Sequence, residues 1–496
     1  MIVFLMKNKF FFNKYIHSLI LLISALSFSI SLDISMPDDG LRHIAFAYNK
    51  DIMHSWGEVF PYSLFGSYDP WFMWHNFLAF FSNFIPIEYV HILINTLSLF
   101  FLMLLIAQYI KNEIKYEFSS MLYIVVISLV FLTASRYLMV RPDLLSGLYV
   151  MAALLLSNRF IYIFILTILY APFYYLFFMY TGSIGLVYLI QKKWNAFWGV
   201  FLASCFSLIL FLLHDLENYL QTVINILTDQ KLRMGLEVGE GKALFSFLSN
   251  VNYFVLLAVF LGISSYIIYK NYKYFKSNNI ALFLLITSIL WVNQARYFYL
   301  FLPLFVIYFL SIILNANKKS FFHNLRKKYL FMIKNVNYAK KSMIFYLIAI
   351  PYCIAVFSYV YNGKSLNKEI NEAVFFKDKA FDNKTILSNR LHEDMYRAVY
   401  LNPKIHFVPS CSVGWFSNED ENIKDIYIRM QKEEGISELE LSKLAKYVNA
   451  DIYIHYLRND KQVLNFEKLN NLGIIPLSIY HNRIIFNIKK EMKNNE

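Results

Sequence analysis

Two adjacent carboxylates, Asp38 and Asp39, stand just after the first apolar segment and are followed by Arg42 and His43. An aspartate can act as a general base that removes a hydroxyl proton, and an arginine can bind a phosphate. Pro37 favours the start of a helix with one carboxylate in its first turn, where the helix dipole stabilises an anion. Two alternatives stay open: the pair caps a helix on a solvated loop, or it binds a divalent cation through its oxygens.

Two later stretches place charged residues where the chain leaves an apolar segment. The first contains Arg136, Arg141 and Asp143, and the second contains Arg296 beside Tyr297. Charged side chains are costly in hydrocarbon, so we expect them to face water or a bound anion. For Arg296, which stands alone among apolar neighbours, anchoring at the membrane boundary is the alternative to anion binding.

The composition is that of a polytopic membrane protein. Of the 496 residues, 58% are hydrophobic and only 16% are charged, whereas soluble chains average about 25% charged residues. The formal net charge of +13 does not indicate nucleic-acid binding, because Lys and Arg form short clusters between apolar segments, as the inner loops of membrane proteins do. The three cysteines show no C-x-x-C spacing, so neither a disulfide framework nor a zinc site is predicted.

The apolar segments and the basic clusters between them predict about eleven transmembrane helices in the plasma membrane. The N-terminus is expected on the cytoplasmic face and the C-terminus outside. The first span, at 16–32, is interpreted as a retained helix rather than a signal peptide. The region 160–190 contains Pro172 and is expected to form two short or broken passes.

Two segments are predicted as large outer loops. Residues 33–88 carry seven acidic against two basic residues, which favours the outer face. Within this loop, the aromatic run 68–75 is expected to lie at the membrane interface and to be anchored there by its tryptophans, with stacking of these rings on a sugar as the alternative. Residues 214–250 form the second expected loop, which is either a mobile cover over a site or an ordinary connector.

A small soluble α/β domain at 361–496 is predicted on the outer face, after a transmembrane domain at 1–360. Strand-like runs are expected at 385–388, 405–408, 451–456 and 474–488. The clearest helix is expected at 437–448, because Ser437 and Glu440 have the spacing of a capping box and precede an amphipathic pattern. The domain has no phosphate-binding loop or nucleophile elbow in its sequence, so a supporting or acceptor-binding role is expected.

The order of these motifs resembles the GT-C superfamily of polyprenyl-phosphate-sugar-dependent glycosyltransferases, most closely its protein mannosyltransferase-like and aminoarabinose-transferase-like branch. The resemblance covers about residues 10–315. It rests on the acidic start of the first outer loop (Asp38-Asp39-Gly40-Leu41-Arg42-His43), the Arg141-Pro142-Asp143 element, and Arg296-Tyr297 followed by Pro303. Many relatives carry Glu at the second acidic position, so the family's catalytic carboxylate corresponds either to Asp38 or to Asp39.

The resemblance implies transfer of a sugar from a polyprenyl-phosphate donor to a glycan, lipid or protein of the cell envelope. Positive charge would bind the donor phosphate, whose departure needs little acid catalysis because polyprenyl phosphate is a stable anion. The implied catalytic residues are Asp38 and Asp39, and the implied substrate-binding residues are Arg42, His43, Arg136, Arg141, Asp143, Arg296 and Tyr297. No cofactor is expected apart from the divalent cation that the carboxylate pair fits.

Two other classes of function stay open. A transporter, flippase or polymerase of lipid-linked glycans also needs outer arginines, but transport favours charged residues near the membrane midplane. The predicted spans contain very few such residues, which favours chemistry at the outer surface. A non-catalytic scaffold with an outer binding domain is the third class, and it predicts that changes at Asp38 or Asp39 have no effect whereas loss of the tail does.

Overall fold

The computed structural model describes part of the chain, and the helices and strands below lie in that part. The described residues are 18–27, 29–30, 39–49, 59–60, 69–114, 142–156, 159–228, 262, 278–288, 301, 303–305, 307–308, 373–389, 397–408, 420–431, 436–457, 465–480 and 482–489.

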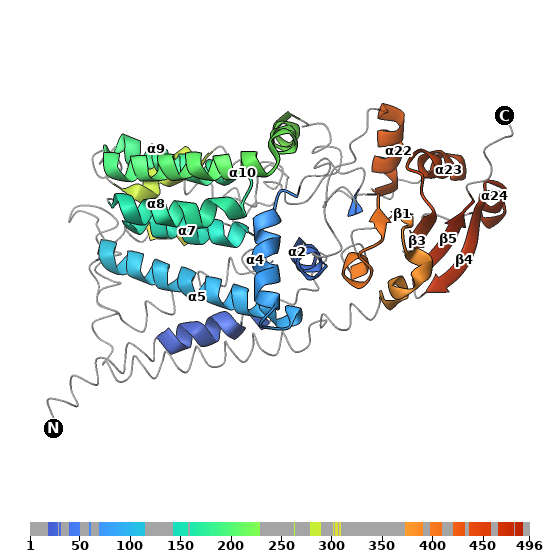
Figure 1. The fold of residues 1–496 in the computed structure, drawn as a ribbon, viewed down its shortest axis with the longest axis horizontal. Helices are drawn as coiled ribbons and strands as arrows, with labels where there is room; N and C mark the ends of the chain where they lie inside the picture. The colour runs from blue at the N-terminus through green and yellow to red at the C-terminus, as the bar shows by residue number, and fades with distance from the viewer. Residues whose placement is uncertain are drawn as a thin grey trace, which may run out of the picture. The chain divides into compact units, whose positions relative to one another are not determined.

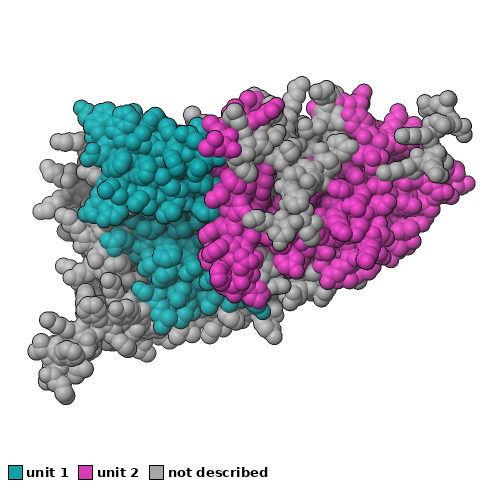
Figure 2. Space-filling model, in the orientation of Figure 1, with its two compact units in different colours: residues 1–33, 88–210, 240–363 teal, residues 34–87, 211–239, 364–496 magenta. Residues whose placement is uncertain are grey.

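The chain divides into two compact units, each made of segments that are far apart in the sequence (Figure 2). Unit 1 comprises residues 1–33, 88–210 and 240–363, and unit 2 comprises residues 34–87, 211–239 and 364–496. Unit 2 therefore contains the acidic segment after the first apolar run, the start of the second expected outer loop, and the polar tail. The domain division at residue 360 stays a prediction.

Unit 1 is built from apolar helices (Figure 1). In chain order they are α5 (Ile87–Ile114), α7 (Asp143–Leu156), α8 (Phe160–Tyr170), α9 (Phe177–Ile190), the first part of α10 (Trp194–Thr228) and α15 (Asn279–Ile286). Residues 18–27 are also helical. Helix α7 packs against α8 and α9, and α15 packs against α9.

The predicted break inside 160–190 is confirmed. Helix α8 ends at Tyr170, a short 3-10 turn spans Ala171–Phe173, and α9 begins at Phe177. Pro172 lies in the turn, where its missing N–H removes the donor that a continuous helix would need. The interruption yields two helices in place of one long one.

One segment among the described residues, Trp194–Leu213 of α10, is long and apolar enough to cross a membrane, with 20 residues. The shorter apolar helices in this part of the chain are Ser18–Ser27, Ile92–Gln108, Leu145–Leu155, Phe160–Phe173 and Phe177–Ile190. The expected spans at 118–133 and 343–360 lie outside the described residues, and of the span at 251–269 only residue 262 is described. The number of crossings and their orientation stay predictions.

Within the segment expected as the second outer loop, residues 214–228 are helical, because α10 continues to Thr228. Leu216, Leu220 and Ile224 recur at four-residue spacing in this stretch, a pattern that favours a helix. The rings of Phe211 and Tyr219 stack with their centroids 5.2 Å apart. The acidic residues near position 215 mark a change in polarity and not the end of the helix.

Unit 2 combines two helices from the acidic segment 33–88 with an α/β tail. The elements are α2 (Asp39–Tyr48), α4 (Phe72–Ser82), the 3-10 turns Val374–Lys377 and Lys379–Phe381, β1 (Thr385–Ser388), β2 (His406–Phe407), α22 (Glu421–Gln431), α23 (Glu438–Tyr447), β3 (Ile452–Tyr456), α24 (Phe466–Asn471), β4 (Ile474–Tyr480) and β5 (Arg483–Ile488).

The tail contains one five-stranded sheet of mixed direction, with the order β2-β1-β3-β5-β4. Strand β1 pairs in parallel with β2 and β3, whereas β5 pairs antiparallel with β3 and β4. The strands expected at 385–388, 405–408 and 451–456 are confirmed, with β2 shorter than expected. The run 474–488 forms two paired strands, and Tyr480 lies opposite Arg483 in the register.

The central strands of the sheet are covered on both faces, whereas β4 at its edge is largely exposed. On one face α22, α23 and α24 contribute Tyr427, Leu444 and Leu469 to a buried cluster with Tyr453 and Phe486 of the central strands. On the other face, the 3-10 turns place Phe376 at 6.3 Å from Phe407 and Phe375 at 4.8 Å from Tyr480, measured between ring centroids. Strand β3 is buried along its whole length, which explains its run of apolar and aromatic residues.

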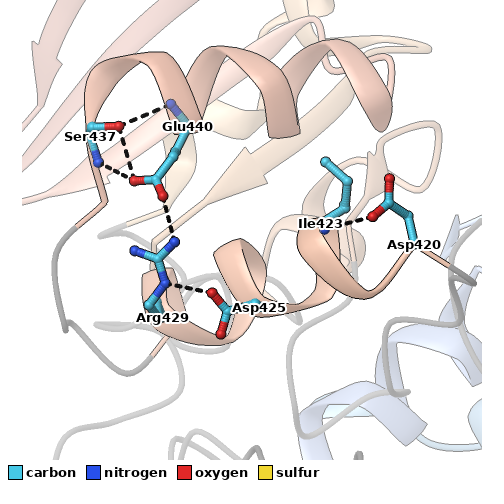
Figure 3. Close-up of polar contacts among 6 residues, drawn as sticks. All are labelled: Asp420, Ile423, Asp425, Arg429, Ser437 and Glu440. Atoms are coloured by element: carbon cyan, nitrogen blue, oxygen red, sulfur yellow. Dashed lines mark hydrogen bonds and ion pairs between the residues drawn. The ribbon is translucent and has the colours of Figure 1, made fainter.

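The predicted capping box at the start of α23 is confirmed, and it extends into an ion pair (Figure 3). The Glu440 carboxylate accepts hydrogen bonds from the backbone N–H of Ser437 at 2.8 Å and from Arg429 Nη2 of α22 at 2.5 Å. Hydrogen bonding to Arg429, then to Ser437, lowers the pKa of Glu440 to about 2. Arg429 also donates through Nε to Asp425 at 2.9 Å, so one carboxylate joins the start of α23 to the end of α22.

Replacing Glu440 with Gln is expected to destabilise the α22–α23 pair by about 1 kcal/mol, because both the capping contact and the charge opposite Arg429 are lost. Hydrogen–deuterium exchange of the amides in the two helices measures this change. Asp425→Asn is the matched control: its side chain is 66% exposed, and such helical pairs contribute only a few tenths of a kcal/mol. Equal effects of the two substitutions would contradict the role of Glu440 as the residue that joins α23 to α22.

His455 makes the tail sensitive to pH. It is buried in β3, with Nδ1 at 3.0 Å from the hydroxyl oxygen of Tyr453. Burial disfavours the imidazolium form and lowers the pKa of His455 to about 4, against an ordinary value near 6.5. The unfolded chain therefore binds more protons than the folded chain between these two values.

The stability of the sheet is expected to fall as the pH is lowered from 6.5 towards 4, because protonation favours the unfolded state in this window. Between pH 7 and pH 5 we expect a loss of about 2 kcal/mol in the free energy of opening of β3 and β5. Hydrogen–deuterium exchange, corrected for intrinsic rates, measures it. His455→Gln should remove most of this pH dependence; an unchanged dependence in that variant would exclude His455 as its source.

Candidate functional site

The candidate site is built on α2, which begins at Asp39 as the sequence predicts. Its four residues from Ile44 to Ala47 are buried, which fixes the helix by packing. Arg42 and His43 precede this apolar stretch and are buried as well, with exposed fractions of 2% and 1%. Burial of an arginine without compensating contacts is costly, so Arg42 and His43 need polar or aromatic partners in their surroundings.

A row of hydrogen bonds joins α2 to α4. The Oδ2 atom of Asp69 lies 2.6 Å from Nδ1 of His75, and Nε2 of His75 lies 2.7 Å from Nδ1 of His43. The second ring nitrogen of His43, Nε2, lies 3.5 Å from Nη2 of Arg42. We call these four residues the relay cluster.

The order of donors along the relay cluster follows from its two ends. An arginine only donates hydrogen bonds, and a carboxylate only accepts them. Nε2 of His43 therefore accepts from Arg42, which places the ring proton of His43 on Nδ1, facing Nε2 of His75. His75 in turn carries its proton on Nδ1 and donates to Asp69. In this arrangement the hydrogen bonds run in one direction, from Arg42 through the two imidazoles to Asp69.

Aromatic rings surround the relay cluster. The Arg42 guanidinium carbon lies 4.4 Å from the centroid of the Trp71 ring, within the range of a cation–π interaction. His43 meets the edge of Trp71, and Phe46 stacks on His75 with ring centroids 5.2 Å apart. These contacts hold both imidazoles and the guanidinium in a low-dielectric environment, where hydrogen bonds to charged groups are strengthened.

Asp69 is held by the turn that precedes α4. Its Oδ1 atom accepts the backbone N–H of Trp71 at 2.9 Å, which leaves Oδ2 directed at His75. The Asp69 side chain is 19% exposed and that of His75 is 5% exposed. The relay cluster therefore runs from buried residues on α2 to a carboxylate with access to solvent.

The geometry of the two imidazoles is that of a hydrogen bond and not of a metal site. A cation between two histidine nitrogens needs about 2 Å to each of them, whereas these nitrogens lie 2.7 Å apart. Among the described residues, no group of three or more His, Cys, Asp or Glu side chains has a spacing suited to a metal ion.

The relay cluster includes two of the residues singled out from the sequence, Arg42 and His43, and adds two, Asp69 and His75. Both added residues lie in the same acidic segment, but nothing local in the sequence connects His75 with His43, which is 32 positions earlier. The Asp69-Pro70 pair does signal a turn before a helix. What sequence reasoning missed was the tertiary contact between α2 and α4.

Other predicted site residues are placed only in part or lie outside the described residues. Asp39 and Asp143 are the first residues of α2 and α7, and the structure describes their backbone only. Asp39 belongs to unit 2 and Asp143 to unit 1. Asp38, Arg136, Arg141, Arg296 and Tyr297 lie outside the described residues.

The expectation that tryptophans of the 68–75 run anchor this segment at a membrane surface is wrong for Trp71 and Trp74. Trp71 is 9% exposed and Trp74 is fully buried. The reason is the packing of α4 against α2, which encloses Trp74 and Leu78 and brings Trp71 over Arg42.

The chain matches no known protein-family model and no curated protein sequence.

The far end of α2 contacts the tail within unit 2. The Nδ2 atom of Asn49 donates to the backbone carbonyl of Val399 at 3.0 Å and lies 3.4 Å from that of Tyr400. The rings of Tyr48 and Tyr400 stack with centroids 5.0 Å apart. The acidic segment 33–88 and the tail thus meet directly at the end of the helix that carries Arg42 and His43.

Asn49→Leu is expected to destabilise the contact between α2 and residues 397–401 by about 1–3 kcal/mol, because it leaves buried carbonyl groups without their donor. Faster hydrogen–deuterium exchange in both segments of the full chain would report the loss. Tyr48→Leu is the control, since Tyr48 is 56% exposed and should contribute less. An Asn49→Leu variant with unchanged exchange would contradict a supporting role of the tail.

Proposed function

We propose that this protein is a membrane glycosyltransferase that transfers a sugar from a polyprenyl-phosphate donor to a cell-envelope acceptor at the outer face of the plasma membrane. The proposal combines the order of acidic and basic motifs in the sequence with the chemistry of the residues around α2. The acceptor is a glycan, a lipid or a protein of the envelope.

The observation that carries the proposal is the buried relay cluster on the helix that starts at Asp39. Apolar residues would join α2 to α4 at lower cost than an arginine, two histidines and an aspartate, because burying charge requires compensating contacts. Polar and titratable side chains that converge in one buried place are candidates for a functional site. A second support is the presence of the acidic segment and the tail in one compact unit.

The proposed reaction needs a base and positive charge. The acceptor hydroxyl attacks the anomeric carbon of the sugar, the bond from that carbon to the phosphate oxygen breaks, and the hydroxyl proton passes to Asp38 or Asp39. Arg141 and Arg296 bind the phosphate of the donor, and charge-assisted hydrogen bonds stabilise the departing polyprenyl phosphate. Arg42 is buried in the relay cluster, so in this proposal it orients His43 and does not bind the donor.

The test is mass-spectrometric profiling of surface glycans, glycoproteins and polyprenyl-phosphate sugars in a deletion strain. The strain is complemented with the wild type, Asp38→Asn, Asp39→Asn or the control Asp51→Asn, which removes a carboxylate from the same acidic segment. Membrane levels are matched by immunoblot. We expect one of the first two variants to lose a sugar from the envelope and to accumulate the lipid-linked donor, with a loss of turnover of at least about 100-fold.

Full complementation by both Asp38→Asn and Asp39→Asn would refute the catalytic assignment. Loss of the same sugar in the Asp51→Asn strain would show that any carboxylate of the acidic segment has this effect, which would also refute a specific base.

A further inference from the structure

We propose that one end of the helical bundle in unit 1 binds the head groups of anionic phospholipids, with Arg159 and Lys192 as its exposed cations. We call residues 159–162 and 191–194 the basic end of the bundle. This inference concerns the contact of the protein with membrane lipid and does not depend on the proposed sugar transfer.

Helices α7, α8, α9 and α10 lie side by side (Figure 1), and hydrogen bonds join three helix ends to the turn between α9 and α10. The hydroxyl of Tyr188, near the end of α9, donates to the carbonyl of Ala153, near the end of α7. Lys193 donates to Oδ1 of Asn279 at 3.1 Å, and Nδ2 of Asn279 donates to the carbonyl of Leu154 at 3.0 Å. The turn is therefore held against the end of α7 and the start of α15.

The start of α8 lies beside the first turns of α10. A Cβ atom on Gly199 would be 3.0 Å from the backbone carbonyl oxygen of Phe160, so glycine allows the two helices to approach closely. Arg159 directly precedes Phe160 and is exposed, and its guanidinium carbon lies 5.4 Å from the ring centroid of Tyr162. Arg159 therefore lies at the same end of the bundle as the turn between α9 and α10.

The basic end concentrates the positive charge of a long apolar stretch. Residues 144–214 contain three basic residues, Arg159, Lys192 and Lys193, and no Asp or Glu. All three lie at the basic end, and Arg159 and Lys192 are exposed there. A concentration of one sign of charge on an apolar surface attracts ligands of the opposite sign.

The backbone of Lys192 has a conformation that favours glycine. Its φ is 59°, in the left-handed region, where the residue that follows a helix is usually Gly or Asn. This conformation is disfavoured for a residue with a Cβ atom. A lysine at this position therefore points to a use of its side chain.

The basic end adjoins the segment that can cross a membrane. That segment begins at Trp194, directly after Lys193, and ends at Leu213. Its 20 residues correspond to a helix about 30 Å long, which is the thickness of the hydrocarbon core. With this segment in the hydrocarbon, Lys192 lies at the level of the lipid head groups.

Helix α10 also presents an apolar face that fits acyl chains. Large apolar side chains are exposed along it at intervals of three or four residues: Trp194, Trp198, Leu202, Phe206 and Ile209. The two tryptophans lie nearest to the basic end, as is typical of the boundary between hydrocarbon and head groups.

An anionic phospholipid fits both parts of this surface. Its phosphate meets the cations, and its chains meet the exposed face of α10. Free phosphate has nothing to cover that face, and a second copy of this chain would bring the same three cations to the contact, where like charges repel. Each Lys or Arg near an anionic lipid surface strengthens binding about fivefold.

Native mass spectrometry of the full chain, purified in detergent and mixed with equal amounts of phosphatidylglycerol and phosphatidylcholine, measures which lipid binds. We expect the wild type to prefer phosphatidylglycerol about 25-fold, from two cations of about fivefold each. Lys192→Gly and Arg159→Gln should each lower this preference about fivefold. Lys443→Gln is the matched control, because it removes an exposed lysine from α23 in unit 2 and should leave the preference unchanged.

Lys192→Gly separates lipid binding from a role in the fold. Glycine adopts a positive φ without strain, so the turn should keep its structure. If the charge of Lys192 serves only to balance the dipole at the end of α9, the variant should melt at a lower temperature in detergent and keep its lipid preference. Lipid binding predicts a lower preference with a melting temperature that is equal or higher.

Three results would overturn the proposal. Equal binding of the two lipids by the wild type would show that the chain does not recognise lipid charge. An unchanged preference in both Lys192→Gly and Arg159→Gln would place the bound lipid elsewhere on the chain. A dimer that persists in the presence of lipid and is lost in Trp198→Ala would assign the exposed face of α10 to a second copy of the protein.

Discussion

The hydrogen bonds from Asp69 through His75 to His43 hold α2 against α4, and the arrangement of the candidate site depends on them. Both contacts are short, and both lie among aromatic rings that exclude water. In such surroundings a polar group without a hydrogen-bond partner is costly, so each of these side chains is stabilised by its hydrogen bond to the next one. The helix that starts at Asp39 is therefore held by polar contacts as well as by apolar packing.

The other end of α2 depends on the tail. Asn49 donates to the backbone near Val399, and this segment leads into β2, the edge strand beside β1. The central strands of the sheet are covered by helices on one face and by aromatic side chains from the 3-10 turns on the other. This packing allows the sheet to hold the end of α2 in place. An α/β tail that only bound an acceptor would need no contact with α2, so its packing argues for a supporting role as well.

Parts of the structure followed from local patterns. The start of α2 after Pro37, the break at Pro172, the capping box of Ser437 and Glu440, and the strands at 385–388 and 451–456 all depend on residues close together in the sequence. Helix α10 continues to Thr228 inside the segment expected as the second outer loop, and the four-residue spacing of apolar residues continues with it.

What the sequence determined by itself was the apolar composition, the helix that begins at Asp39, and the elements of the tail, because capping and periodicity act over a few residues. Only the tertiary structure decided that His43 meets His75 and Asp69, that Trp71 and Trp74 are buried, and that Asn49 reaches the tail. The contact of His43 with His75 joins residues 32 positions apart, and the contact of Asn49 with Val399 joins residues 350 positions apart. Their existence depends on how helices pack, which no local pattern of residue types encodes.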